Sequence, residues 1–333
     1  MSASIPPDQT PLLEVTGLVK YFPIKRGIIG ALQHRQRRMV RAVDHVSFQL
    51  QRGEVLALVG ESGCGKTTTA LTVLGLVEPS AGRVVFEGRP LHETLRRDRS
   101  LRRAVQMIFQ DPYEALNPRM TVGQIVAEPL EVHHLLSSAA ARRERVLATL
   151  EEVGLRPAAE FLHRRPHELS GGQRQRVVIA GALVTEPHLL VADEPVSMLD
   201  VSIRAEILML LNELRKRRGI SILFITHDLA TAAFFADRIA VMYLGRIVEI
   251  GPAETIIQES LHPYTKALIS VVPVPDPRRR REHIILQGET PNPADVPPGC
   301  RFHPRCPLAI DACRASDPVL EVKQGREVAC IRA

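Results

Sequence analysis

The sequence contains no tryptophan, and aromatic residues make up only 4% of its 333 residues. Proteins that bind single-stranded nucleic acid stack the bases on aromatic side chains set among basic ones. The basic residues that give the net charge of +6 therefore lack the aromatic neighbours that such a surface needs. We interpret the charge as a solvated surface rich in arginine, and we expect no nucleic acid among the partners of this protein.

Long hydrophobic runs are also absent. A membrane-spanning helix needs about 18–20 consecutive apolar residues, and the longest run here covers only residues 177–184. The polar, proline-rich residues 1–11 lack the basic and then apolar pattern of a signal peptide. We therefore expect a cytoplasmic protein that reaches a membrane only through its partners.

Cysteine is scarce and unevenly placed. Cys64 stands alone, whereas the other four lie in the last segment, at Cys300, Cys306, Cys313 and Cys330. In a reducing cytoplasm this clustering favours a metal site over disulfide bonds. The spacing differs from the close cysteine pairs of structural zinc sites. Four thiolates hold either a [4Fe–4S] cluster or a zinc ion, so both stay open.

Short apolar runs and helical segments alternate along most of the chain. Buried strands are expected at residues 55–59, 105–109, 189–192, 222–226 and 239–243. Helical periodicity separates these runs, and such alternation implies an α/β fold with a largely parallel sheet. The stretch at about 112–168 is rich in Ala, Leu, Glu and Arg and is expected to form helices inserted into this core.

A glycine-rich segment between an expected strand and an expected helix matches the P-loop pattern. Its residues are Gly60, Glu61, Ser62, Gly63, Cys64, Gly65, Lys66 and Thr67, followed by Thr68. The glycines let backbone N–H groups approach phosphate oxygens, and the helix N-terminus adds a favourable dipole. Lys66 is expected to reach the β- and γ-phosphates of a nucleotide, and Thr67 to bind Mg²⁺. The alternative is a glycine-rich turn with a surface lysine.

Two adjacent carboxylates, Asp193 and Glu194, end the apolar strand at 189–192. Burying a strand that ends in two acids is costly unless the acids bind something. Asp193 suits Mg²⁺ coordination, directly or through water, and Glu194 suits the general base that polarises an attacking water. A solvated strand end is the alternative, which the nearby P-loop pattern disfavours.

A second anion site is indicated after Leu169. The segment combines a good helix N-cap with two glycines that expose backbone amides at a helix start: Ser170, Gly171, Gly172 and Gln173. A capped helix without a ligand is the alternative.

These motifs, in this order and with His227 after them, resemble the ATP-binding cassette (ABC) family over about residues 12–255. The resemblance implies a RecA-like P-loop NTPase fold with a mostly parallel core sheet, an antiparallel β subdomain and the inserted helical subdomain. It also implies a head-to-tail dimer, in which ATP lies between the P-loop of one cassette and the Ser170 segment of the other.

Further site residues follow from this resemblance. Gln110 matches the Q-loop glutamine, which touches Mg²⁺ or its water, and His227 matches the switch histidine, which contacts the γ-phosphate. Asp200 matches the D-loop aspartate. Phe22 is expected to stack on adenine, with the adjacent Tyr21 as the alternative.

Two positions depart from the common family pattern. Met198 stands where alanine is commoner, which leaves the local D-loop geometry open, and Cys64 occupies a variable P-loop position that we interpret as a packing site. The residues that the family uses for catalysis are all retained: Lys66, Glu194 and His227. The sequence therefore predicts a competent ATPase.

Three further segments resemble the ATPases of oligopeptide and dipeptide importers: residues 109–122, 262–268 and 299–307. Details around Tyr21 look more like the F-type than the D-type subunit of such systems. The resemblance implies a D-type ATPase partner, two transmembrane permease subunits, an extracytoplasmic solute-binding protein and a peripheral place on the cytoplasmic face of the inner membrane. We expect an ATPase domain at 12–255 and a C-terminal extension at 256–333.

Alternatives to peptide import stay open at this point. Nickel chelates and glutathione are carried by similar systems, and a non-transport ABC ATPase acting on DNA or ribosomes is a different class. The long coiled coil of chromosome-maintenance members and the second cassette of translation factors are both missing from the sequence.

Some peptide-importer ATPases with this type of C-terminal segment carry a [4Fe–4S] cluster. The resemblance therefore implies such a cluster on the four clustered cysteines, with zinc or no metal as alternatives. His303 is a possible substitute ligand. The expected role is structural, because the segment is too polar and proline-rich to fold on a core of its own.

Overall fold

The computed structural model describes residues 10–24, 38–272 and 283–333. The chain divides into two compact units. Among the described residues, the first contains 10–12, 50–55 and 91–225, and the second contains 13–24, 38–49, 56–90, 226–272 and 283–333.

Parallel strands form the core of the first unit, in the order β8, β7, β6. Their bounds are β6 (Val105–Ile108), β7 (Leu189–Asp193) and β8 (Ser221–Thr226). Every residue of β7 and β8 is buried, as expected for a strand covered on both faces. The apolar runs of the sequence therefore fall where a parallel sheet needs them.

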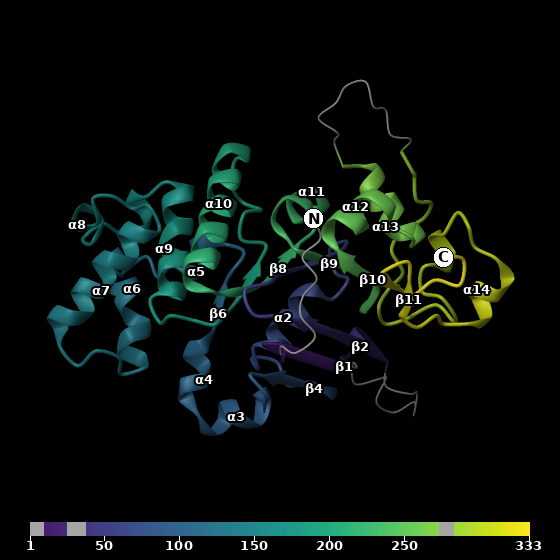
Figure 1. Cartoon of the computed structure of the whole chain (residues 1–333), viewed down its shortest axis with the longest axis horizontal. Helices are drawn as coiled ribbons and strands as arrows, with labels where there is room; N and C mark the ends of the chain where they lie inside the picture. Colours follow the sequence, from purple (N-terminus) through teal and green to yellow (C-terminus); the bar gives the residue numbers. More distant parts are fainter. Residues whose placement is uncertain (1–9, 25–37, 273–282) are drawn as a thin grey trace, which may run out of the picture. The chain divides into compact units, whose positions relative to one another are not determined.

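The remainder of the first unit is helical, and Figure 1 shows α6, α7, α8 and α9 gathered together. Contacts join α6 with α7, and α9 with α5, α6 and α7. The bounds are α3 (Leu91–Arg97), α4 (Arg99–Ala104), α5 (Pro112–Ala115), α6 (Val122–Val132), α7 (Ala139–Glu152), α8 (Ala158–Phe161), a 3₁₀ turn η1 (Pro166–Glu168), α9 (Gly171–Leu183) and α10 (Val201–Arg218). Helices thus fill the stretch whose composition predicted them.

The second unit contains an antiparallel sheet in the order β2, β1, β4, β5. Its strands are β1 (Leu13–Pro23), β2 (Met39–Leu50), β4 (Ala81–Phe86) and β5 (Arg89–Pro90). Residues 78–82 include the proline, serine and glycine that are typical of a turn, yet β4 begins at Ala81. Gly82 has φ +84°, and a Cβ there would lie 2.3 Å from the Gly17 carbonyl oxygen, so this glycine serves a close approach of two strands.

The remaining strands of this unit are hydrogen-bonded to one another in the order β11, β12, β10, β9, β3. Strand β3 pairs with β9 in parallel, and the remaining pairs are antiparallel. The bounds are β3 (Val55–Val59), β9 (Arg238–Tyr243), β10 (Arg246–Pro252), β11 (Glu321–Lys323) and β12 (Arg326–Val328). The helices of the unit are α2 (Lys66–Val73), α11 (Leu229–Phe235), α12 (Ala253–Glu259), α13 (Pro263–Ser270), a 3₁₀ turn η2 (His303–Arg305) and α14 (Asp311–Ala315).

The C-terminal segment adds strands to this sheet. Val328 of β12 is fully buried and pairs with Glu249 of β10, and β12 lies between β10 and β11 in the sheet. Upstream, Phe302 packs against Tyr243 and Tyr264, with ring centroids 5.3 and 5.4 Å away. A segment too polar for its own core therefore gains stability from the sheet and its aromatic cluster.

In the described ranges, no helix combines the length and the apolar character that crossing a membrane requires.

Candidate functional site

The P-loop lies between β3 and α2, in the context that its sequence pattern predicted. Two of its glycines are required by the surrounding backbone. A Cβ on Gly60 would lie 2.2 Å from the Met242 carbonyl oxygen, and one on Gly65, where φ is +107°, would lie 2.0 Å from the Ala42 carbonyl oxygen. Only glycine fits at these distances, so neighbouring strands fix both ends of the loop.

Lys66 is directed back into this loop. Its side chain is 5% exposed, and Nζ donates hydrogen bonds to the carbonyl oxygens of Gly60, at 2.7 Å, and Glu61, at 3.0 Å. A buried ammonium needs such oxygen partners. Phosphate oxygens are stronger partners for it because they carry charge. The lysine is thus held at the centre of a loop that fits a phosphate group.

The middle of the loop is open, because no heavy atom lies within 4 Å of a Cβ built on Gly63, where φ is +77°. Ser62 and Thr67 are exposed, and Thr68 is partly exposed. Cys64 is 2% exposed, and burial raises the pKa of its thiol. This protonated, buried thiol suits a packing role rather than that of a nucleophile.

In the first unit, the two carboxylates at the end of β7 differ in exposure. Asp193 is 4% exposed, whereas Glu194 is partly exposed. Glu194 has φ +45°, a costly conformation for a residue with a Cβ, which proteins tend to keep at functional sites. Gln110 Nε2 donates to Glu194 Oε2 at 3.3 Å. Two residues that lie 84 positions apart and were both predicted for the site therefore meet.

Helix α9 begins at the second predicted anion site. Ser170 Oγ accepts a hydrogen bond from the Gln173 backbone N–H, and Gln173 Oε1 accepts one from the Ser170 N–H. This capping box fixes the helix start. A Cβ on Gly172 would lie 2.8 Å from Cγ2 of Ile203 in α10, so this glycine also serves helix packing. Asp200, at the N-cap of α10, is exposed.

The two aromatic candidates for adenine stacking differ in their surroundings. Tyr21 is half-buried, and its hydroxyl donates to Asp44 Oδ1 at 2.7 Å. Phe22 is 39% exposed, with Lys20 Nζ 5.0 Å from its ring centroid. The ring of Phe22 is therefore the more accessible of the two. His227, the other predicted contact residue in this unit, is exposed directly after β8.

The surroundings of Glu61 were not predicted. Its carboxylate contacts Arg305 and Thr290, and its backbone N–H donates to Tyr264 Oη at 3.0 Å. Arg305 lies 244 positions away in the chain, so no local spacing could have indicated this contact.

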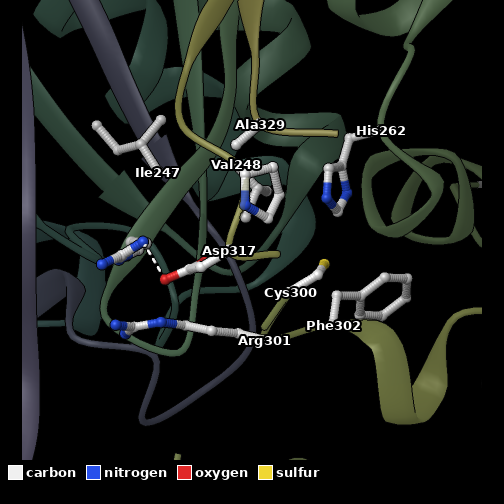
Figure 2. Close-up of a pocket in the computed structure, with 10 residues that line it drawn as sticks. Ile247, Val248, His262, Cys300, Arg301, Phe302, Asp317 and Ala329 are labelled. Carbon is white, nitrogen blue, oxygen red and sulfur yellow. Dashed lines mark hydrogen bonds and ion pairs between the residues drawn. The ribbon is translucent and has the colours of Figure 1, made fainter. Parts of the chain in front are cut away.

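The four clustered cysteines line a common cavity, together with His262 and His303. The backbone N–H of Cys300 donates to the Cys313 carbonyl oxygen at 2.8 Å, and burial is the main cause that raises the pKa of Cys300 to about 11. Figure 2 shows Cys300 and Phe302 in a neighbouring pocket with His262. Within the described ranges, no three His, Cys, Asp or Glu side chains are arranged to hold a metal ion. The donor atoms therefore suit a metal, but their arrangement is not preformed.

The predicted residues are thus distributed over both units. The first contains Gln110, Asp193, Glu194, Asp200 and the Ser170 segment. The second contains Phe22, the P-loop, His227 and the four cysteines.

Two family models match the chain. One, described as ABC transporter, matches residues 43–197. The other, described as oligopeptide/dipeptide transporter, C-terminal region, matches residues 248–313.

Curated relatives match nearly the whole chain. The probable peptide ABC transporter ATP-binding protein y4tS of Sinorhizobium fredii is 49% identical, over 96% of this chain and 89% of the relative. The dipeptide transport ATP-binding protein DppF of Haemophilus influenzae is 48% identical over 97% of both chains. The putative oligopeptide transport ATP-binding protein YkfD of Bacillus subtilis is 48% identical over 96% of this chain and 95% of the relative.

Solved structures are also similar. CbiO1 from Clostridium perfringens, part of the ABC transporter complex cbiONQ, aligns with a TM-score of 0.63 and 31% identity over 75% of this chain and 91% of that chain. The ATP-binding cassette MJ0796, in a dimeric post-hydrolysis state bound to ADP and phosphate, aligns with a TM-score of 0.62 and 27% identity over 72% and 98%.

A variant of Gly65 tests whether the short distance to the Ala42 carbonyl oxygen, and not the positive φ angle alone, requires glycine at this position. We expect Gly65→Ala to lower the affinity for ATP more than tenfold, because the added methyl group would displace the loop from the Ala42 carbonyl. Gly53→Ala is the control, since Gly53 also has positive φ, at +69°, but open space around its Cβ position. Titration with a fluorescent ATP analogue measures both variants. Equal affinities in the two would contradict the steric argument.

Proposed function

Because the chain belongs to the ATP-binding proteins of the oligopeptide/dipeptide ABC transporter family, we propose that it hydrolyses ATP to drive peptide import across the cytoplasmic membrane. The observation that carries the choice of substrate is the match of residues 248–313 to the C-terminal region of oligopeptide/dipeptide transporters. Relatives named for peptide or dipeptide transport support it over nearly the full length. Nickel chelates, glutathione and non-transport roles have no such support.

The P-loop is the proposed binding site for the phosphates of ATP. Backbone amides around the open Gly63 contact phosphate oxygens, and Lys66 exchanges its two carbonyl partners for the β- and γ-phosphates. The buried Asp193, with Thr67 and Gln110, would hold Mg²⁺, and the ion would supply positive charge to offset the charge that develops on the phosphates. Phe22 stacks on adenine, and its greater exposure compared with Tyr21 supports this choice.

Glu194 is the proposed general base. It accepts a proton from the water that attacks the γ-phosphate, while ADP leaves from the opposite side of the phosphorus. The hydrogen bond from Gln110 supports this role, because it orients the carboxylate without removing its charge. His227 contacts the γ-phosphate and is the third proposed catalytic residue, together with Lys66 and Glu194.

The Ser170 segment is proposed to act on ATP bound to a second cassette. Its glycine amides at the start of α9 suit a phosphate, and the similar MJ0796 forms a dimer bound to ADP and phosphate. We infer an F-type subunit, paired with a D-type ATPase and placed on the cytoplasmic face of the membrane by two permease subunits. A solute-binding protein delivers the peptide from outside.

Replacement of the base tests the proposal directly. We expect Glu194→Gln to abolish labelled-dipeptide uptake by cells and to lower the ATPase rate of the captured transporter by at least about a hundredfold, because the amide accepts no proton from water. ATP binding should persist, since Gln has nearly the same shape. Asp237→Asn, a carboxylate after α11, is the control. Normal turnover in Glu194→Gln would exclude this glutamate as the base.

The four clustered cysteines are proposed to hold a [4Fe–4S] cluster. Their position on one cavity supports a common ligand, and such a ligand would stabilise a segment that contains little regular structure. Since burial raises the pKa of Cys300 to about 11, a bound cation would be needed to keep this thiolate charged at neutral pH. The cysteine side chains must rearrange to bind it together.

Metal analysis of protein purified without oxygen tests this proposal. We expect about four iron atoms and about four sulfides per chain, with loss of both in Cys306→Ser and retention in Cys64→Ser, because Cys64 lies in the P-loop. One zinc ion per chain would show that the cysteines bind zinc instead of an iron–sulfur cluster. A chain without metal would contradict both proposals.

A further inference from the structure

The second residue of the P-loop is held by the C-terminal extension. Arg305 donates from Nη1 to Glu61 Oε2 at 2.8 Å and from Nη2 to Glu61 Oε1 at 3.2 Å. Thr290 Oγ1 donates to Glu61 Oε2 at 2.6 Å. A bidentate pair of this kind fixes the direction of the carboxylate as well as its position.

The backbone of Glu61 is fixed on both sides of its side chain. Its N–H donates to Tyr264 Oη at 3.0 Å, and its carbonyl oxygen accepts the Lys66 Nζ hydrogen bond at 3.0 Å. A displacement of Glu61 would therefore move a partner atom of the P-loop lysine. The contacts that the C-terminal extension makes with Glu61 therefore also affect the position of Lys66, the proposed phosphate-binding residue.

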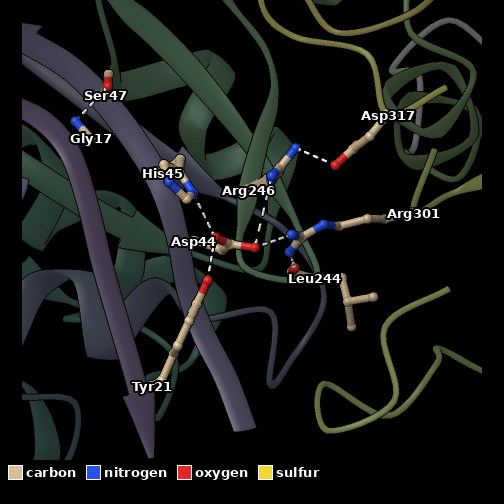
Figure 3. A network of polar contacts seen from close by, with 9 residues as sticks. All are labelled: Gly17, Tyr21, Asp44, His45, Ser47, Leu244, Arg246, Arg301 and Asp317. Carbon is tan, nitrogen blue, oxygen red and sulfur yellow. Dashed lines mark hydrogen bonds and ion pairs between the residues drawn. The ribbon is translucent and has the colours of Figure 1, made fainter. Parts of the chain in front are cut away.

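Arg305 is itself held firmly. Its side chain is 10% exposed, and its guanidinium carbon lies 6.0 Å from the Tyr243 ring centroid. At the other end of the same loop, the buried Arg301 forms an ion pair with the buried Asp44 and donates to the Leu244 carbonyl oxygen at 2.6 Å. Figure 3 shows Arg301 directed at Asp44. The loop that presents Arg305 is therefore anchored to the body of the second unit.

The Arg305–Glu61 pair is strong enough to affect the loop. Exposed ion pairs contribute little to stability, but these side chains are only 10% and 27% exposed. Burial alone would raise the pKa of Glu61, whereas the hydrogen bonds from Arg305 and Thr290 lower it below its usual value. The carboxylate therefore stays charged at neutral pH, and removal of Arg305 would leave that charge with one remaining side-chain donor.

We propose that Arg305 and Thr290 are positioning residues for the ATPase reaction, which hold Glu61 and so preorganise the P-loop for ATP. The inference deepens the proposed function and depends on it. This role requires no contact between either side chain and the nucleotide. Because preorganisation acts before chemistry, its loss weakens binding of the ground state and the transition state equally.

The test compares Arg305→Gln with Glu61→Gln and the double variant in the full-length chain. We expect each single variant to weaken binding of a fluorescent ATP analogue about tenfold, as for loss of one charge-assisted hydrogen bond. The double variant should be no weaker than the singles, because both remove the same interaction. In the transporter captured from membranes, KM for ATP should rise by a similar factor with kcat within about twofold.

Arg38→Gln is the matched control. It removes another arginine–carboxylate pair of the extension, with Asp295, but both side chains are more than half exposed and neither contacts the P-loop. We expect unchanged ATP affinity in this variant. If Arg305→Gln does not fold, Thr290→Val gives the second measurement, because Thr290 is exposed and its replacement should weaken ATP binding about threefold.

Wild-type affinity in folded Arg305→Gln and Thr290→Val, or additive losses in the double variant, would overturn the inference. A fall in kcat with unchanged KM would also overturn it. Failure of the proposed function has a different signature, since the wild-type chain itself would then show no peptide-dependent ATPase activity.

Discussion

The close approach of neighbouring backbone to two P-loop glycines is the constraint on which the candidate site depends. Gly60 leaves no room for a side chain beside the Met242 carbonyl, and Gly65 leaves none beside the Ala42 carbonyl. The loop is therefore fixed at both ends between β9 and β2, while its middle stays open at Gly63. This arrangement places the buried Lys66 where it contacts loop carbonyls and is available to the more highly charged oxygens of phosphates.

The C-terminal extension belongs to the same structural unit as this loop. It adds β12 to the sheet next to β10, places Phe302 against Tyr243 and Tyr264, and pairs Arg301 with Asp44. Asp44 in turn accepts a hydrogen bond from Tyr21, the neighbour of the proposed adenine-stacking Phe22 (Figure 3). A segment that the sequence assigns to peptide transporters is thus built into the nucleotide-binding part of the protein. These contacts connect the residues around the cysteine cavity with the residues around the P-loop.

The family, the ATPase activity and the P-loop fold with its mixed core sheet and antiparallel β subdomain were predictable from the sequence, and the comparisons confirm them. Local pattern sufficed because the P-loop, Asp193 and Glu194 each follow a short apolar strand. The start of strand β4 could not be read from local pattern, because Gly82 is typical of a turn although it serves a close strand crossing. The contact of Glu61 with Arg305 joins distant segments and leaves no local pattern. The individual roles of the site residues and the domain limits stay predictions.

Capture of the tagged chain from membranes in mild detergent, followed by mass spectrometry, tests the central claim most directly. The account predicts recovery of a second ABC ATPase and two polytopic permeases in comparable amounts, with retention increased by ATP in the Glu194→Gln variant. Recovery of ribosomal or DNA-associated proteins without any permease would contradict the transport function and would leave only the ATPase assignment standing.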